Sequence, residues 1–422
     1  MKTTHILLLL ITIGTIPGSS IAQTWTPTGA QTNGWFSVAS SADGTKLIAA
    51  MLQDAYSGNE GGEVYTSTNS GVFWMSNNLP ILPWVSVASS ADGLRLVACS
   101  GTGGTGAIYT STNGGADWEE ASNAPAIPWS SIASSADGSR LIAASGYRAI
   151  YTSTNSGATW ISNAVSGTLG TIPWIFVASS ATGTTLAAAA YGSNIYVSTN
   201  AGANWSQSPA PQEEWEGVAS SADGTKLAAV ARTSSGGAGP IYTSTNSGSS
   251  WTSNNVPNEL WSAIASSADG AKLAAVSGGN SPGPTYVSTN SGTTWTLDPA
   301  STAPWSSALG AVASSADGNE LITVFGSGVT HSFGSVSWYI GPVYISQTLS
   351  SPLINVTFDN GNLTLSWLVP STNFVLQQSP DFQNWFDVTN QPSLNLINLN
   401  NEVTLPMTNN IGFYRLATES SK

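Results

Sequence analysis

One segment of this chain is written seven times, and that repetition constrains the fold more than any other feature. The letters ASSADG stand at 39–44, 88–93, 133–138, 219–224, 265–270 and 313–318, and ASSATG stands at 178–183. A tryptophan precedes each copy, at Trp35, Trp84, Trp129, Trp174, Trp215, Trp261 and Trp305. Successive tryptophans are 41 to 49 residues apart. A repeat of this length with several short strands is typical of a β-propeller, in which each repeat forms one blade.

The third copy shows the strands of one unit. Residues 129–135 alternate in the period-two manner of a strand. The Asp-Gly pair at 137–138 marks a tight turn, because glycine tolerates a positive φ. Residues 139–145, 149–154 and 159–163 follow as three further strands. Each unit therefore predicts four antiparallel strands.

The sequence thus predicts an all-β chain whose residues 23–342 form a seven-bladed β-propeller of four-stranded antiparallel blades. Two segments compete for the strand that closes the ring. Residues 24–29 match a fourth strand with no blade before it, and residues 335–342 are a fourth-strand candidate in the last unit. A closed ring removes exposed strand edges, and the sequence leaves the choice of closing strand open.

After the repeats the composition changes, and residues 343–422 predict a small β-sandwich. An Asn-Gly hairpin at 360–361 separates two strand-like runs, and further strand-like runs follow. The segment resembles the fibronectin-type-III-like C-terminal modules of large secreted bacterial proteins. Trp367 and Trp385 are interpreted as core residues of this module.

The N-terminal residues 1–22 predict a secretory signal peptide. Lys2 supplies the positive start, residues 6–13 are an apolar run, and the small residues before Gln23 suit cleavage after Ala22. The mature protein is therefore expected to be secreted, extracellular or periplasmic, with no membrane span and in monomeric form. The lone cysteine, Cys99, allows no internal disulfide.

Six turns resemble the Asp-box, or BNR repeat, of the sialidase and xyloglucanase-like propellers. The motif is Ser-x-Asp-x-Gly-x-x-Trp between the third and fourth strands of a blade, and here asparagine replaces the aspartate every time. An asparagine can still accept backbone hydrogen bonds in such a turn, so the resemblance implies a structural role. The matching residues are Ser67, Asn69, Gly71, Trp74, Ser111, Asn113, Gly115, Trp118, Ser153, Asn155, Gly157, Trp160, Ser198, Asn200, Gly202, Trp205, Ser244, Asn246, Gly248, Trp251, Ser288, Asn290, Gly292 and Trp295.

The two faces of such a propeller carry different loops. The ADG turns and the Asp-box turns share one face and hardly vary, whereas the other connections differ in every unit. We call these the repeated face and the variable face. Variable loops on a rigid scaffold commonly carry binding sites. The candidate ligand-binding residues on the variable face are Asp54, Glu60, Arg148, Trp215 and Arg232.

Acidic residues are predicted to collect on the variable face, against two arginines. They are Asp54, Glu60, Glu63, Glu119, Glu120, Glu213, Glu214, Glu216, Glu259 and Asp298. The net charge of −13 disfavours nucleic acid as a partner, because that ligand requires a basic surface. An acidic rim would attract cationic or hydroxyl-rich ligands. The alternative interpretation is that these are solvated loop acids that keep the protein soluble.

The same residues bear on an enzymatic function. A sialidase grips a carboxylate with three converging arginines, and the four arginines of this propeller are divided between the faces. A glycoside hydrolase needs two carboxylates about 5–10 Å apart. The candidates for that pair are Glu213, Glu214, Glu216, Glu119 and Glu120.

Other chemistries lack the necessary residues. His331 is the single histidine after the predicted signal peptide, so the sequence predicts no metal site, no catalytic triad and no cofactor. The repeat tryptophans are interpreted as packing residues between blades. The sequence therefore favours a secreted, non-catalytic module that binds a glycan or protein ligand on its variable face. A glycoside hydrolase is the alternative, and a purely structural extracellular component is a third interpretation.

Overall fold

The computed structural model describes most of the chain after residue 23. The residues it does not describe are 1–23, 54–60, 102–104, 147–148, 164–173, 234, 279–281, 299–309, 325–326, 334–335, 341, 348–353, 360–361, 369–373, 380–383, 391, 396–398, 407–412 and 419–422. The predicted signal peptide lies outside the described residues. Within them, no helix is long and apolar enough to span a membrane.

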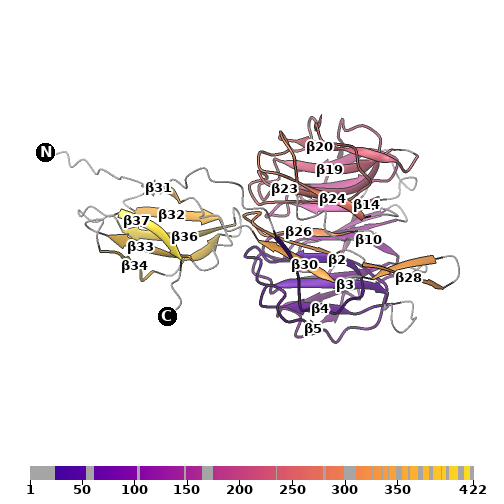
Figure 1. Ribbon diagram of the computed structural model, residues 1–422, viewed down its shortest axis with the longest axis horizontal. Helices are drawn as coiled ribbons and strands as arrows, with labels where there is room; N and C mark the ends of the chain where they lie inside the picture. Colours follow the sequence, from indigo (N-terminus) through magenta and orange to yellow (C-terminus); the bar gives the residue numbers. More distant parts are fainter. Residues whose placement is uncertain are drawn as a thin grey trace.

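Seven four-stranded antiparallel sheets form a ring, as predicted. Figure 1 shows this propeller from its side, with the C-terminal domain to its left. The first strand of each blade contacts the first strands of its neighbours around the ring, so the first strands are innermost. From the inside outwards, the first three blades are β2 Gly34–Ser40, β3 Leu47–Gln53, β4 Val64–Ser67 and β5 Met75–Ser76; β6 Trp84–Ser89, β7 Leu96–Ser100, β8 Ile108–Ser111 and β9 Glu119–Glu120; β10 Trp129–Ser134, β11 Leu141–Ser145, β12 Ala149–Ser153 and β13 Ile161–Asn163. The next three are β14 Trp174–Ser179, β15 Leu186–Ala190, β16 Ile195–Ser198 and β17 Ser206–Gln207; β18 Glu214–Ser220, β19 Leu227–Arg232, β20 Ala238–Ser244 and β21 Thr252–Ser253; β22 Trp261–Ser266, β23 Leu273–Gly278, β24 Pro282–Ser288 and β25 Thr296–Leu297.

The seventh blade is built from both ends of the propeller sequence. From the inside outwards its strands are β26 Val312–Ser314, β27 Glu320–Val324, β30 Val343–Gln347 and β1 Thr24–Pro27. The N-terminal strand therefore closes the ring, with Thr24 paired to Gln347. The predicted boundary at residue 342 falls one strand short, because β30 belongs to the propeller sheet.

The other candidate for the closing strand contributes instead to a separate hairpin. β28 Ser327–Phe333 and β29 Val336–Ile340 pair with each other as a two-stranded sheet between β27 and β30. This hairpin projects from the side of the propeller opposite the sandwich (Figure 1). Residues 335–342 therefore do not supply the closing strand, because the chain makes an inserted hairpin before returning to the blade.

A ring of backbone hydrogen bonds surrounds the propeller axis. The second alanine of each ASSA segment donates its N–H to the carbonyl of the corresponding alanine in the next blade, at distances of 2.7–2.8 Å. The ring runs through Ala42, Ala91, Ala136, Ala181, Ala222, Ala268 and Ala316, and Ala316 bonds back to Ala42. This closed ring of hydrogen bonds explains why the ASSA segment is repeated, because every blade must place the same N–H and C=O groups next to the neighbouring blade.

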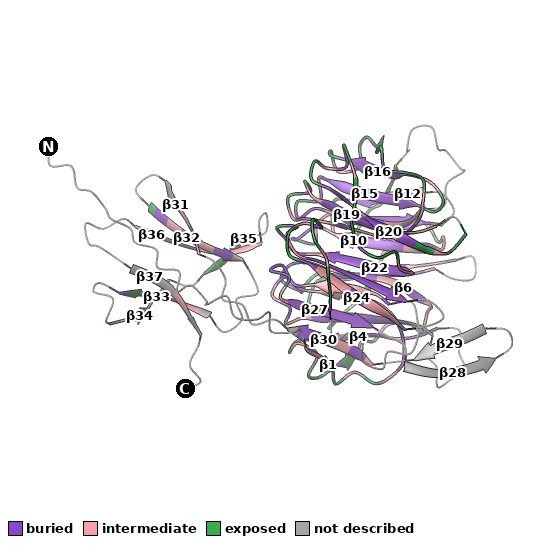
Figure 2. Ribbon diagram, turned by 45° about the horizontal axis from the view of Figure 1, so that its top comes forward, coloured by how far each residue is buried: buried purple, intermediate pink, exposed green. Residues whose placement is uncertain are grey.

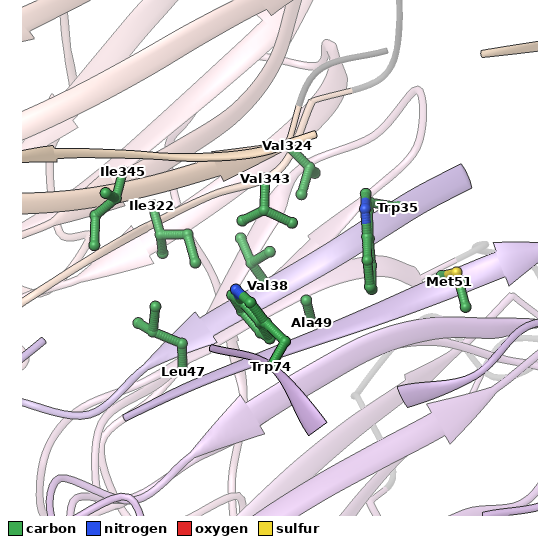
Figure 3. Close-up of a cluster of buried hydrophobic side chains, with 10 residues drawn as sticks. All are labelled: Trp35, Val38, Leu47, Ala49, Met51, Trp74, Ile322, Val324, Val343 and Ile345. Carbon is green, nitrogen blue, oxygen red and sulfur yellow. The ribbon is translucent and has the colours of Figure 1, made fainter. Parts of the chain in front are cut away.

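The hydrophobic core lies between blades, and the blade strands are accordingly mostly buried (Figure 2). Where the first and seventh blades meet, Trp35, Leu47 and Trp74 of one face Ile322 and Val343 of the other (Figure 3). The blade-opening tryptophans are buried at every position whose side chain is described: Trp35, Trp84, Trp129, Trp215 and Trp261. Each packs edge-on against a tyrosine of the third strand in its own blade. Their role is packing between sheets.

The six Asp-box-like turns share one hydrogen-bond network, seen well at 153–160. The Ser153 hydroxyl donates to Asn155 Oδ1 at 2.9 Å and accepts the Gly157 N–H at 2.9 Å. Asn155 Oδ1 also accepts the N–H of Thr159, while its Nδ2 donates to Thr159 Oγ1. The asparagine therefore supplies both an acceptor and a donor. Ser156 has a φ of 56°, and Ser or Ala takes the same left-handed conformation at four equivalent positions.

The C-terminal domain has two sheets. The four-stranded sheet contains β31 Asn355–Asp359, β32 Asn362–Leu368, β36 Asn400–Pro406 and β35 Ser393–Asn395 in that order, and the three-stranded sheet contains β34 Phe386–Asp387, β33 Phe374–Ser379 and β37 Phe413–Thr418. Trp367 is buried in their shared core with Leu365 and Val403. Trp385 is only half-buried.

Candidate functional site

The repeated face is held together by its own turns. In each of the five blades with a Ser or Ala at the left-handed position, the N–H of that residue donates to a carbonyl in the ADG-type turn of the same blade, as Ser156 does to Ser139 at 2.8 Å. The two sets of turns therefore lie on one face, as the strand order predicts. Within each aspartate-containing ADG turn a serine hydroxyl donates to the aspartate, as Ser135 does to Asp137 Oδ1 at 2.6 Å.

The basic residues of the repeated face join one blade to the next. Arg95 Nη1 donates to the carbonyl of Asp137 at 2.6 Å, one blade further on. Lys46 and Lys226 bond in the same way to aspartate carbonyls of their following blades. The stem of Arg95 also lies against Gly138, so that a Cβ there would be 2.5 Å from the Arg95 Cβ. These cations are part of the scaffold.

The variable face carries a charged cluster in the fifth blade. Glu216 of β18 forms an ion pair with Arg232 of β19, with 3.4 Å between Oε1 and Nε, and each side chain is 18% exposed. Arg232 also donates to the carbonyls of Trp261 and Gly278 in the sixth blade, at 3.1 and 3.3 Å. A guanidinium with donors pointing in several directions suits this arrangement. Arg232 therefore links two blades and positions a carboxylate between them.

Two further side chains complete this cluster. Glu214 is paired in register with Arg232. The Tyr191 hydroxyl, from the fourth blade, lies close to the Glu214 carboxylate. Tyr191 is 43% exposed, so an aromatic ring and a carboxylate stand together at the surface. We call Tyr191, Glu214, Glu216 and Arg232 the blade-five cluster.

Burial shapes the electrostatics of the cluster. Burial raises the pKa of the Glu216 carboxyl above its ordinary value, the charge of Arg232 limits the rise, and Glu214 adds to it. Burial also raises the pKa of Tyr191, and the neighbouring Glu214 carboxylate adds to the rise. Two carboxylates and one guanidinium leave the cluster with one net negative charge when all three are ionised.

Glu213 and Trp215, next to the cluster, have structural partners. Tyr242 donates to Glu213 Oε1 at 3.2 Å, and burial together with that carboxylate raises the pKa of Tyr242 to about 12. The indole of Trp215 is fully buried and donates to the carbonyl of Ser193 at 2.9 Å. Trp215 is therefore a core residue and not a surface platform for a ligand.

The other predicted site residues are not brought together with this cluster. Glu119 and Glu120 are exposed on β9, the outermost strand of the second blade, so they do not form a pair with carboxylates on the innermost strand of the fifth blade. Asp298 is 2% exposed and accepts a hydrogen bond from Trp25 of the closing strand, so it does not belong to an acidic rim. Asp54, Glu60 and Arg148 lie outside the described residues.

Tyr191 is not among the site residues that the sequence predicted. Tyr191 lies in the short loop after β15, whose other residues are small or polar. An aromatic residue in such a loop was the one sequence feature that could have indicated a binding residue here. The pairing of Tyr191 with Glu214 depends on the contact between the fourth and fifth blades. A local sequence pattern cannot predict a contact between residues of two different blades.

The axial channel holds a cavity of about 150 Å³ at the repeated face. It is lined by the two serines and the second alanine of every ASSA segment, together with Leu399 of the sandwich. The first serine of each segment donates to the carbonyl of the next residue, as Ser134 does to Ser135. In the described part of the chain, no group of three His, Cys, Asp or Glu residues is placed to hold a metal ion.

These features define the class of protein as a closed seven-bladed β-propeller with a C-terminal β-sandwich. Among solved structures, the chain is similar to "YCF48 bound to D1 peptide", with a TM-score of 0.53 and 12% identity over 83% of this chain and 99% of that one. It is also similar to "YCF48 from Cyanidioschyzon merolae", with a TM-score of 0.49 and 15% identity over 77% of this chain and 98% of that one. At this identity the first likeness supports the fold alone. No protein-family model and no curated protein matches the chain, so its resemblances to the Asp-box repeat and to the fibronectin-type module stay predictions.

Proposed function

We propose that this chain is a non-catalytic recognition module that binds a protein ligand through its variable face. The observation that carries the proposal is the blade-five cluster, where the exposed ring of Tyr191 stands beside the Glu214 carboxylate at the inner edge of the ring. An aromatic side chain next to a carboxylate can hold a lysine or arginine side chain by cation–π and ionic contacts together. The ligand is therefore a segment with basic side chains.

Three observations support a protein ligand and its placement away from the repeated face. One propeller of similar fold is described as bound to a peptide. On the repeated face of this chain, Lys46, Arg95 and Lys226 already bond to the neighbouring blade, which leaves them committed to the scaffold. The overall charge of −13 favours association with a basic partner.

A peptide library displayed on phage and selected on the full chain tests the proposal. Selected peptides should be rich in lysine or arginine, and Glu214→Gln or Tyr191→Ala should weaken their binding by about tenfold, the loss of one charged or cation–π contact. Asp117→Asn is the matched control, because it removes one exposed negative charge on the repeated face. Peptides that bind all three variants equally would contradict the proposal, and binding on a glycan array with the same pattern of losses would replace the protein ligand by a glycan.

Export is proposed separately, from the signal-peptide pattern of residues 1–22. Expression of the full chain in a secreting host should yield a mature protein whose N-terminus is Gln23, as read by mass spectrometry. An uncleaved N-terminus on a folded intracellular product would contradict it.

A glycoside hydrolase remains the second candidate because of one observation. Glu216 has a raised pKa and lies near Glu214, and a glycoside hydrolase needs a general acid with a raised pKa close to a second carboxylate. Against this, Glu216 is already paired with Arg232. Hydrolysis on a polysaccharide panel, abolished by Glu214→Gln and by Glu216→Gln, would establish the enzyme, and inertness on the whole panel would dismiss it.

A further inference from the structure

We propose that the centre of the repeated face is a docking site for the chain's own C-terminal sandwich, with Leu399 as the anchor. Leu399 directly precedes β36, in the connection from β35. Its side chain packs against the alanines that form the hydrogen-bonded ring around the axis. The occupant of the site is therefore present in the structure.

The ring of alanines is suited to receive one aliphatic side chain. Six of the seven are buried and the seventh, Ala222, is partly buried. Small side chains leave space at the axis, and the cavity beneath is lined by the seven ASSA segments. Among its described lining residues, Leu399 alone comes from outside the propeller. Leu399 thus lies at the axial cavity on this side, against the seven ASSA segments.

The backbone of Leu399 supplies a second, independent argument. Its φ is 55°, in the left-handed region that branched apolar residues rarely occupy. Its N–H donates to the carbonyl of Asn395 at 2.8 Å, which closes the turn. Glycine or asparagine would fit this turn with less strain. A strained backbone conformation persists where the surrounding structure stabilises it. Here the stabilising contact is that of the Leu399 side chain with the alanines of the propeller.

Among the described residues of the sandwich, those that form its core do not include Leu399. The buried cluster of the sandwich contains Leu363, Leu365, Trp367, Leu376 and Val403 and their partly buried neighbours, and Leu399 is not among them. Removal of its side chain should therefore leave the sandwich folded. Docking closes the axis from the repeated face, so a ligand can approach the axis from the variable face.

Cysteine labelling tests the docking directly. Ala222→Cys places a thiol beside the anchor, and Cys99 serves as an unreactive internal reference because it is buried and burial raises its pKa. Adding Leu399→Ala should raise the labelling rate of the new thiol by about tenfold, as expected when the apolar contact of a partly buried leucine is lost. Adding Phe386→Ala instead should change nothing, because Phe386 is 58% exposed on the other sheet of the sandwich. An equal labelling rate in all three proteins overturns the proposal.

A second variant separates docking from turn geometry. Leu399→Gly relieves the positive φ, so the melting temperature of the sandwich should rise while the labelling rate of Ala222→Cys also rises. X-ray scattering of the full chain should show a larger radius of gyration for this variant than for the wild type. If the sandwich is stabilised while labelling and the radius of gyration stay unchanged, Leu399 is only a turn residue and the docking proposal is wrong.

Discussion

The repeated and variable faces of the propeller are built from the same strands but use their polar groups differently. On the repeated face, Arg95 reaches Asp137 of the next blade, and Ser135 satisfies the carboxylate of Asp137. On the variable face, Glu214 and Tyr191 are partnered yet remain at the surface. A face whose groups are bonded to one another builds the ring, whereas a face with a partly exposed charged cluster can bind another molecule.

The difference also explains which residues recur. A contact between neighbouring blades must be repeated at each junction of the ring, so its residues recur in the sequence. A site that occurs once requires no repetition. Arg232 and Glu216 form an ion pair in the fifth blade, and the equivalent positions of other blades are free to differ.

The largest expected effect comes from a substitution in a repeated turn. Gly138→Ala should cost about 3 kcal/mol of unfolding free energy, because Gly138 has a φ of 69° and an added Cβ would meet the Arg95 side chain. Gly146→Ala, beyond β11 on the variable face, has open space and serves as the control. Urea denaturation measures both, and equal stabilities would contradict the contrast between the faces.

A smaller effect is expected from restoring an aspartate in one Asp-box-like turn. Asn113 Nδ2 donates to Asp117 Oδ2 at 2.9 Å, so Asn113→Asp would set two carboxylates against each other. The loss should be about 1 kcal/mol at neutral pH and should disappear at acid pH, when one carboxyl is protonated. Asn155→Asp faces the hydroxyl of Thr159, which can donate instead, and should be close to neutral. Thermal unfolding measures the stability of both variants. Equal losses of stability would show that the side chains of Asp117 and Thr159 make no difference, which would contradict this prediction.

The smallest expected effect is a difference in the sign of pH dependence between the faces. Burial alone would raise the pKa of Asp137, but hydrogen bonds from Ser135 and Ser139 and the charge of Arg95 bring it below its ordinary value. Asp137 therefore contributes stability above the ordinary aspartate pKa, and that contribution is lost as the pH falls through its folded-state pKa. Glu216 has a raised pKa, so its contribution is present below the ordinary glutamate pKa and is lost as the pH rises through the folded-state value.

The free energy of unfolding of the wild type and of the variants Asp137→Asn and Glu216→Gln, measured from acid to neutral pH, tests this difference in sign. The free-energy difference between wild type and Asp137→Asn should grow from acid to neutral pH, by less than about 1 kcal/mol because the site is largely exposed. For Glu216→Gln the wild type should lose stability relative to the variant over the same range. The same sign for both variants would contradict the electrostatic distinction between the faces.

Much of the fold could be predicted because it is repeated. The seven ASSA segments and the blade-opening tryptophans such as Trp129 predicted the number and order of strands. The six Asp-box-like turns predicted where third and fourth strands meet. The candidate site was predicted only in part: Glu214, Glu216 and Arg232 come together, whereas Glu119 and Glu120 lie on a distant outer strand.

The sequence by itself determined the blades, because the period of strands, the tight turns and the packing tryptophans are local patterns that each repeat states again. The tertiary structure alone decided that Thr24 pairs with Gln347, that Tyr191 reaches Glu214 and that Leu399 sits in the alanine ring. Each of these contacts joins different blades, different domains or the two ends of the propeller. Their partners are chosen by how the ring closes, and ring closure is a property of the whole set of blades.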